Sequence, residues 1–287
     1  MTTSATFPWA KGHGTENDFV LLPDPDGTRH GDLDPDFVAR LCHRRRGIGA
    51  DGVLRVVRSD AAAGAPDGAE WFMDYRNADG SLSQMCGNGV RVFGRWLAEE
   101  GLVDPAAPLP IGTRGGIKVV TYEGDRHSGD ISVDMGVPEV LGSTWVEIGA
   151  RRLEARHVDM GNPHAVAVVD DLDLDALGPL VPPGYDHAVY PDGVNVELVQ
   201  RVGDRRVRMR VHERGSGETR SCGTGVCAAA VAEAAGAEAA GVGAARPATY
   251  RVDVPGGALQ VTWRADDHVV LTGPAVIVAR GQMSWTG

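Results

Sequence analysis

The chain has 287 residues, of which 43% are hydrophobic and 23% charged, a balance typical of a globular protein with one large or two medium domains. Its formal net charge of −11 would repel nucleic-acid phosphates and anionic lipid, so we expect neither nucleic acid nor a membrane as partner. No export signal or bilayer-spanning apolar run is recognisable, which predicts a cytoplasmic location where thiols stay reduced.

The order of apolar residues and turn residues predicts many strands and two long helices. In the first half we expect a short helix at 37–45, a helix at 87–99, and strands at 17–22, 52–57, 71–75, 117–122 and 131–135. The helix at 87–99 is apolar on several sides, which indicates a central position.

The second half follows the same plan. A helix begins near residue 223 and runs into an alanine-rich segment, 228–245. We expect strands at 145–148, 156–159, 165–169, 194–199, 206–211, 250–254, 259–263, 269–272 and 275–279. Because regular alternation of strand and helix is missing, a doubly wound sheet is disfavoured and an α+β fold is favoured.

Two segments, 77–90 and 213–226, resemble each other. Each contains Cys-Gly-polar-Gly-Val at the start of a predicted helix, with the cysteine at Cys86 or Cys222. A polar residue stands nine places before each cysteine, Asn77 in one segment and Glu213 in the other. The simplest interpretation is a duplicated domain; the alternative, a chance repeat in a chain with 39 glycines, is weakened by the matching context.

Four cysteines in a reduced compartment are core residues, metal ligands or catalysts rather than a disulfide framework. We interpret Cys42 and Cys227 as core residues because they lie within helical patterns. Cys86 and Cys222 instead stand where unpaired N–H groups and the helix dipole favour a thiolate with a lowered pKa and bind a carboxylate.

Two such helix starts facing one substrate could invert an amino-acid carbon. One thiolate would remove the α-proton and the opposite thiol would return a proton to the other face, while backbone N–H groups stabilise the developing charge. No cofactor is expected, because neither of the two lysines, Lys11 and Lys118, stands in a pyridoxal-phosphate motif.

On these residues the chain closely resembles the diaminopimelate epimerase family over nearly its whole length. The motifs that carry the resemblance are 11–19 (KGHGTENDF), 47–52 (GIGADG), 75–80 (YRNADG), 85–89 (MCGNG), 160–164 (MGNPH), 193–196 (GVNV), 213–219 (ERGSGET), 222–225 (CGTG) and 255–257 (PGG). Each is modest alone, and their shared order makes the match specific.

The resemblance implies two pseudo-symmetric lobes, each a mixed β-barrel-like sheet around a central helix. The N-terminal lobe would span 1–136 with a C-terminal strand at 274–287, and the second lobe 137–273. It also implies conversion of LL-2,6-diaminoheptanedioate to the meso form in lysine and peptidoglycan-precursor synthesis. A small-molecule substrate is thus the expected partner, and a homodimer is left open.

The resemblance further implies roles for individual residues. Cys86 would be the base and Cys222 the acid for the LL substrate. The amides that hold the reacting carboxylate would come from Gly87, Asn88, Gly223 and Thr224. Asn17 and Glu213 would contact the reacting ammonium, and His164 would lie close to Glu213 and help set its charge. The distal end of the substrate would be bound by Asn77, Asn162, Asn195 and Arg214.

Other functions are less well matched. A proline-, hydroxyproline- or histidine-racemase-like enzyme would use the same two thiols, but Asn88 fills the position of a histidine in the proline-racemase motif. Residues 47–52 fit G-x-G-x-x-G, yet a strand rather than a helix follows, which argues against dinucleotide binding. A zinc protein is disfavoured because no C-x-x-C or H-x-x-x-H pair occurs.

Overall fold

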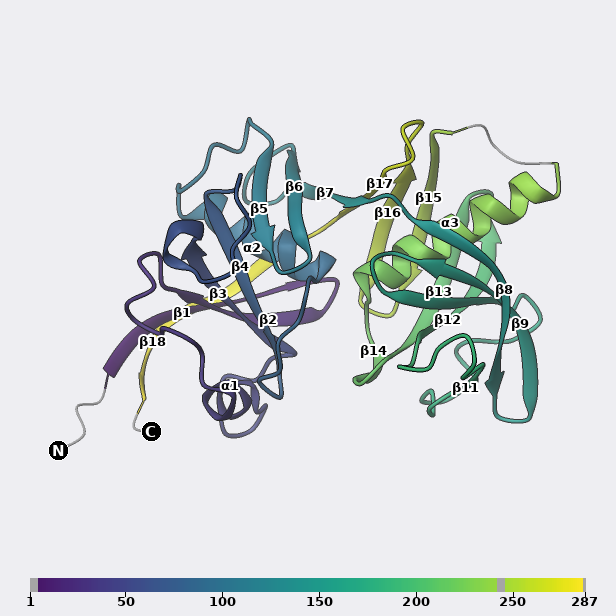
Figure 1. Cartoon of the computed structure of the whole chain (residues 1–287), viewed down its shortest axis with the longest axis horizontal. Helices are drawn as coiled ribbons and strands as arrows, with labels where there is room; N and C mark the ends of the chain where they lie inside the picture. Colours follow the sequence, from purple (N-terminus) through teal and green to yellow (C-terminus); the bar gives the residue numbers. More distant parts are fainter. Residues whose placement is uncertain (1–4, 242–245, 286–287) are drawn as a thin grey trace. The chain divides into compact units, whose positions relative to one another are not determined.

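The computed structural model describes residues 5–241 and 246–285 (Figure 1). The first four residues, where no export signal was recognised, and the end of the alanine-rich segment 228–245 lie outside the described residues. The chain divides into two compact units. Unit 1 comprises residues 1–133 and 274–287, and unit 2 comprises residues 134–273. Each unit is described by itself.

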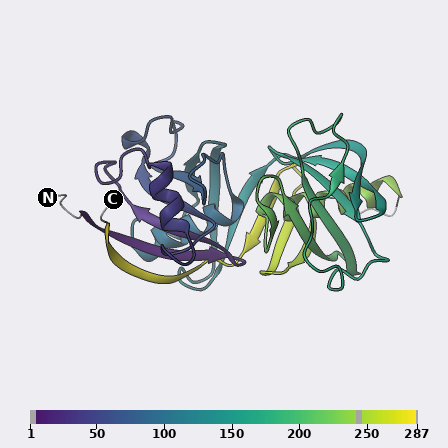
Figure 2. The same cartoon turned by 90° about the horizontal axis from the view of Figure 1, so that it is seen from below.

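Unit 1 is a mixed sheet around one helix. Its helical elements are α1 (Pro35–Cys42), η1 (Ser59–Ala61) and α2 (Gly87–Glu99). Its strands are β1 (Ala5–Gly14), β2 (Asn17–Pro23), β3 (Gly52–Arg58), β4 (Trp71–Asn77), β5 (Leu109–Thr113), β6 (Gly116–Glu123), β7 (Asp130–Gly136), which runs into unit 2, and β18 (Val276–Trp285). The C-terminal β18 pairs antiparallel with β1, and Figure 2 shows the two strands side by side.

Unit 2 is likewise a mixed sheet with one long helix. Its helix is α3 (Gly223–Ala239). Its strands are β8 (Glu139–Ile148), β9 (Arg151–Asp159), β10 (Pro163–Val168), β11 (Gly184–Tyr185), β12 (Asn195–Gly203), β13 (Arg206–Glu213), β14 (Gly217–Thr219), β15 (Ala248–Val254), β16 (Gly257–Trp263) and β17 (Val269–Gly273).

The two units repeat one strand topology. In unit 1 the order β18-β1-β2-β3-β4-β5-β6-β7 has pairings that run antiparallel, antiparallel, parallel, antiparallel, parallel, antiparallel and antiparallel. In unit 2 the order β8-β9-β10-β12-β13-β15-β16-β17 has the same sequence of directions. The repeated motif around each cysteine is therefore part of a repeat of the whole unit.

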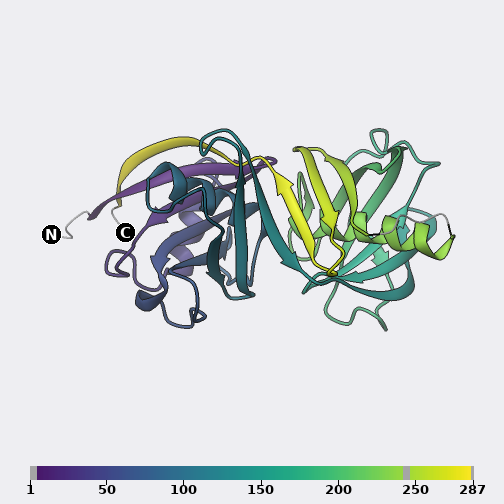
Figure 3. The ribbon, with the colours of Figure 1, turned by 90° about the horizontal axis from the view of Figure 1, so that it is seen from above.

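Each unit encloses its long helix. α2 contacts β1, β2, β3, β4, β5, β6 and β18, and every residue from Gly87 to Ala98 is buried. α3 contacts β8, β9, β10, β12, β13, β15, β16 and β17, as Figure 3 illustrates. The predicted α+β fold of mixed sheets around central helices is confirmed.

Most predicted elements are present, although β8, β9 and β18 are five or six residues longer than predicted. The helix at 87–99 has the predicted bounds, whereas the short helix begins and ends earlier than predicted because Asp34 caps it and Pro35 opens it. The prediction missed β1, β5 and the short strands β11 and β14. None of the described helices is long and apolar enough to span a membrane.

Candidate active site

Cys86 occupies the N-cap of α2 in extended conformation, and its sulfur accepts a hydrogen bond from the backbone N–H of Gly89 at 3.4 Å. Its thiol lies 3.6 Å from Oδ1 of Asn17, to which it can donate. Asn88 also donates to this oxygen through Nδ2, at 3.2 Å. Asn17, Cys86 and Asn88 are thus gathered at one point, beside Gly87.

The amide of Asn17 is oriented by a charged group behind it. Its Nδ2 donates to Oδ2 of Asp51 at 2.8 Å, which turns its Oδ1 toward Cys86. Arg44 bridges Asp51 and Asp18. Burial opposes ionisation of Asp18, but hydrogen bonds from Arg44 and Lys11 lower its pKa to about 2. The ion pairs of Arg44 with Asp18 and Asp51 therefore hold Asn17, the residue expected at the substrate ammonium.

Arg91 is a residue of this half-site that the sequence analysis missed. Its side chain is fully buried, and its guanidinium donates to Oδ1 of Asn88 at 2.9 Å and to the carbonyl of Gly87 at 3.3 Å. It also donates to the carbonyl of Pro274 at 3.5 Å. The available signal was that Arg91 stands between Val90 and Val92, on the part of the helix expected to be buried.

Asn77, by contrast, is engaged in its own turn. Its Nδ2 donates to Oγ of Ser81 at 3.0 Å, and its carbonyl accepts from the N–H of Gly80 at 2.9 Å. This is the turn chemistry of asparagine. Nothing in unit 1 brings Asn77 into hydrogen-bond contact with Cys86 among the described residues, so its role at the substrate stays a prediction.

Cys222 caps α3 as Cys86 caps α2. It has the same extended conformation, and its sulfur accepts from the N–H of Gly225 at 3.4 Å. Thr224 places Oγ1 3.5 Å from the sulfur, and Asn162 donates to the same Oγ1 at 3.4 Å. Cys222, Thr224 and Asn162 are therefore brought together, beside Gly223.

The electrostatic surroundings of Cys222 overturn one expectation. The helix start was expected to lower the thiol pKa, but burial and the carboxylates of Glu213 and Glu197 raise the pKa of Cys222 well above its ordinary value. Hydrogen bonds from Gly225 and Thr224 act in the opposite direction and do not outweigh burial. Cys222 is accordingly held as a thiol, which can donate a proton.

Glu213 lies beside Cys222 at the end of β13. Its carboxylate accepts from the hydroxyl of Thr219. Burial raises the pKa of Glu213, and hydrogen bonding to Thr219 and to the Cys222 thiol lowers it in part. The role expected for His164 beside Glu213 stays a prediction, because the direct hydrogen-bond partners of His164 are other residues.

Those partners are Glu197 and Asn162. Nδ1 of His164 lies 2.7 Å from Oε1 of Glu197, and Nε2 lies 3.1 Å from Oδ1 of Asn162. The side chains of His164 and Glu197 are both 0% exposed. The sequence analysis missed Glu197; a charged residue inside the apolar run 194–199 was the signal that could have found it.

Asn195 and Arg214 lie next to each other at the ends of β12 and β13. The amide of Asn195 accepts from the backbone N–H of Arg214 at 3.0 Å and donates to the carbonyl of Pro163 at 3.1 Å. Asn195 therefore holds the backbone at Arg214 and at Pro163, which lies between Asn162 and His164. The guanidinium of Arg214 is exposed and has no ion-pair partner within residues 5–241 and 246–285.

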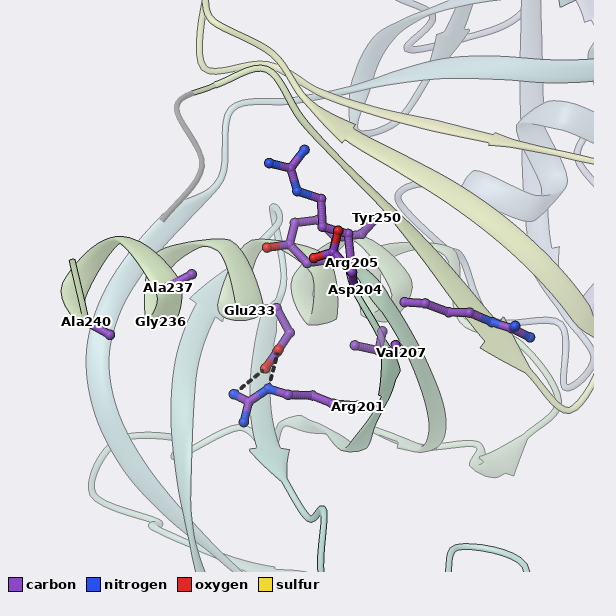
Figure 4. Close-up of a pocket in the computed structure, with 11 residues that line it drawn as sticks. Arg201, Asp204, Arg205, Val207, Glu233, Gly236, Ala237, Ala240 and Tyr250 are labelled. Carbon is purple, nitrogen blue, oxygen red and sulfur yellow. Dashed lines mark hydrogen bonds and ion pairs between the residues drawn. The ribbon is translucent and has the colours of Figure 1, made fainter. Parts of the chain in front are cut away.

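A hollow of about 700 Å³ in unit 2 contains none of the predicted site residues (Figure 4). Its lining charges are largely paired: Arg201 binds Glu233 through hydrogen bonds of 2.6 and 3.0 Å, and Arg206 lies 2.7 Å from Asp253. Across the described part of the chain, no group of three or more histidine, cysteine, aspartate or glutamate side chains is arranged to hold a metal ion.

The fold matches solved epimerase structures. A hydroxyproline epimerase from Agrobacterium vitis aligns with a TM-score of 0.72 at 15% identity, over 99% of this chain and 94% of that one. The chain therefore shares the fold of this epimerase, and at 15% identity the likeness shows the fold alone.

The sequence comparisons narrow the class. The family model for diaminopimelate epimerase matches residues 9–141 and 156–278. A diaminopimelate epimerase from Streptomyces coelicolor is 55% identical over 98% of this chain and 96% of its own, and one from Corynebacterium glutamicum is 50% identical over 97% and 98%. The chain belongs to the diaminopimelate epimerase family.

Proposed function

We propose that this chain is an isomerase that interconverts LL- and meso-2,6-diaminoheptanedioate with two cysteines and no cofactor. The observation that carries the proposal is the pair of matched cysteine N-caps, Cys86 and Cys222, one in each repeat of a chain from this family. In both, the sulfur accepts the helix N–H three residues later at 3.4 Å.

The reaction begins when the Cys86 thiolate removes the α-proton of the LL substrate. The electron pair left on carbon is delocalised into the adjacent carboxylate, which the N–H groups of Gly87, Asn88, Gly223 and Thr224 bind. The Cys222 thiol then delivers its proton to the opposite face of the carbon. The products are the inverted centre, a Cys86 thiol and a Cys222 thiolate, and the reverse reaction exchanges the two roles.

The charges around the two sulfurs support this assignment. Unit 1 has the buried guanidinium of Arg91 beneath the start of α2, and a cation favours an anion in its neighbourhood. Unit 2 has the carboxylates of Glu213 and Glu197, and these keep Cys222 protonated. The carboxylates of Asp18 and Asp51 behind Asn17 are paired with Lys11 and Arg44, so the two half-sites differ in charge although their backbones are alike.

The remaining predicted residues bind the rest of the substrate. Asn17 and Glu213 meet the reacting ammonium, and Asn77, Asn162, Asn195 and Arg214 meet the distal amino-acid end. Arg214 suits the distal carboxylate because its exposed guanidinium can donate two parallel hydrogen bonds. The cytoplasmic location stays a prediction, and whether the protein forms a homodimer is left open.

The test is a stereochemical product assay on LL-diaminoheptanedioate without any added cofactor. We expect the meso form to appear, with incorporation of solvent deuterium at the inverted carbon. Cys86→Ala and Cys222→Ala should each lower kcat by about a thousandfold or more, because each removes one of the two proton-transferring groups.

Cys42→Ala is the matched control, since Cys42 belongs to a buried hydrophobic cluster of unit 1 that contains neither Cys86 nor Cys222. It should remain active. Epimerisation at the wild-type rate by either Cys86→Ala or Cys222→Ala would refute the two-cysteine reaction, and exchange with proline or histidine but not with diaminoheptanedioate would refute the substrate.

A further inference from the structure

Glu197 is a buried carboxylate that affects the reaction above only through its charge near Cys222. Its side chain is fully buried, and its Oε1 lies 2.7 Å from Nδ1 of His164. Its Oε2 has no hydrogen-bond partner among the described residues. A buried carboxyl group held on one side only is a weak stabiliser, so a purely structural role does not account for it.

The repeat offers an internal comparison. In unit 1, β2 and β3 pair in parallel with Phe19 opposite Gly52; in unit 2, β10 and β12 pair in parallel with His164 opposite Asn195. The positions that correspond to His164 and Glu197 are therefore Phe19 and Leu54. The same fold is thus built with two apolar residues in one unit and with a histidine–glutamate pair in the other.

The pair lies directly beneath the start of α3. A Cβ on Gly225 would come within 2.6 Å of Oε1 of Glu197, and within 3.4 Å of the Cys222 sulfur. At the corresponding Gly89 the nearest atoms are Cβ of Cys86 and Cδ2 of Leu54, both at 3.4 Å. The carboxylate of Glu197 therefore occupies the space that a glycine leaves open next to Cys222.

Hydrogen bonding fixes where the protons of this group lie. Nε2 of His164 faces Oδ1 of Asn162, which only accepts, so Nε2 must carry a proton. Nδ1 faces a carboxyl oxygen, so a second proton lies between His164 and Glu197, on one or the other. With Oδ1 bound in this way, Asn162 directs Nδ2 at Oγ1 of Thr224, which lies 3.5 Å from the Cys222 sulfur.

We propose that Glu197 is a positioning residue for proton transfer at Cys222: it keeps Nε2 of His164 protonated, and thereby holds Asn162 and Thr224 in the orientation that the reaction needs. This inference rests on the proposed function. Glu197 touches neither sulfur nor substrate, and it acts through His164. It also makes the two half-sites chemically unequal, because Phe19 and Leu54 cannot provide such a relay.

The first test uses the wild-type protein and no substrate. Nitrogen-15 spectra of the protein labelled at histidine should show Nε2 of His164 bonded to hydrogen, identified by its loss in His164→Gln. In Glu197→Leu, Nδ1 of His164 loses its hydrogen-bond partner, so the tautomer with a proton on Nε2 is no longer fixed and the Nε2–H signal should weaken or disappear. A wild-type His164 whose Nε2 carries no proton overturns the inference.

The second test is kinetic. Glu197→Leu should lower kcat about 10- to 100-fold, because His164 loses its partner and no longer holds Asn162 and Thr224 in place. Glu233→Leu is the matched control: Glu233 is a buried glutamate of α3 that pairs with Arg201 outside the site. It should lower stability without changing kcat. A wild-type kcat in Glu197→Leu overturns the inference.

A third variant separates function from folding. The double substitution His164→Phe with Glu197→Leu copies the residues of unit 1, and should fold with a melting temperature at or above that of the wild type while losing activity. A folded, fully active double variant overturns the inference. If the wild type itself fails to epimerise diaminoheptanedioate, the proposed function fails, and the nitrogen-15 result still decides the protonation of the pair.

Discussion

A thiol at the start of a helix is subject to two opposing effects, and the outcome depends on its surroundings. Unpaired N–H groups favour the thiolate, whereas burial and nearby carboxylates favour the thiol. Cys222 shows the second outcome, since only 6% of it is exposed and two carboxylates lie close by. Sequence alone could identify the helix start, because Cys-Gly-Thr-Gly is local. It could not show the carboxylates, because Glu197 arrives from a strand 25 positions earlier in the chain.

The raised pKa of Cys222 predicts how its alkylation depends on pH. The thiolate is the reactive form, so Cys222 should react slowly with iodoacetamide at neutral pH, and its rate should rise only above pH 9. Glu213→Gln removes one of the charges that raise this pKa, so the midpoint should move to lower pH. Mass spectrometry of the peptide containing Cys222 gives the rate at each pH.

Cys86, in the same sample, reports the concentration and activity of the reagent. A midpoint for Cys222 that stays constant or rises in Glu213→Gln would show that the carboxylate does not control this thiol.

At the scale of elements, the start of α3 lies closer to the side chains of β12 than the start of α2 lies to those of β3. Gly225→Ala would bring a Cβ within 2.6 Å of Oε1 of Glu197 and break its bond to His164, whereas Gly89→Ala meets only ordinary contacts at 3.4 Å. We expect Gly225→Ala to cost about 1–3 kcal/mol of the free energy of unfolding and most of the activity. Gly89→Ala should cost less, and gains up to about 1 kcal/mol from helix propensity.

Urea unfolding of the two variants measures this difference directly, since each replaces the same residue at the same helical position. Equal stability losses in the two variants would contradict the close approach of Glu197 to α3.

Comparing the predicted elements with the observed ones shows which of them sequence patterns can predict. The helix at 87–99 has the predicted bounds because Gly87 follows its cap and Gly101 follows its end, and both signals are local. β1 was missed because its residues, such as Pro8, Lys11 and Gly12, do not alternate or cluster as strand residues do; it is a strand because β2 and β18 pair with it. β5 was missed for a similar reason, since Pro110 and Gly112 are poor strand residues that β4 and β6 nevertheless pair.

At the scale of the whole chain, the repeat explains why the last segment belongs with the first. β8 opens the sheet of unit 2 next to β9, and the corresponding place next to β1 is taken by β18 from the C-terminus. Each unit thereby completes the same series of strands. The family resemblance implied both this division and the C-terminal strand of the first lobe. Residue patterns alone could not place β18 beside β1, because this pairing joins residues more than 250 positions apart.

If both sulfurs act on one carbon atom, they must be able to approach each other when no substrate separates them. We therefore predict that diamide, which accepts two electrons and two protons, oxidises Cys86 and Cys222 to an intramolecular disulfide and abolishes activity. Dithiothreitol should restore activity, and substrate should slow the oxidation by occupying the space between the sulfurs. Peptide mapping without reduction identifies the linked pair, and Cys42→Ala should behave as the wild type because Cys42 is buried elsewhere in unit 1. Oxidation that joins other cysteines, or full activity in a protein whose Cys86 and Cys222 are linked, would show that the two half-sites do not share one substrate.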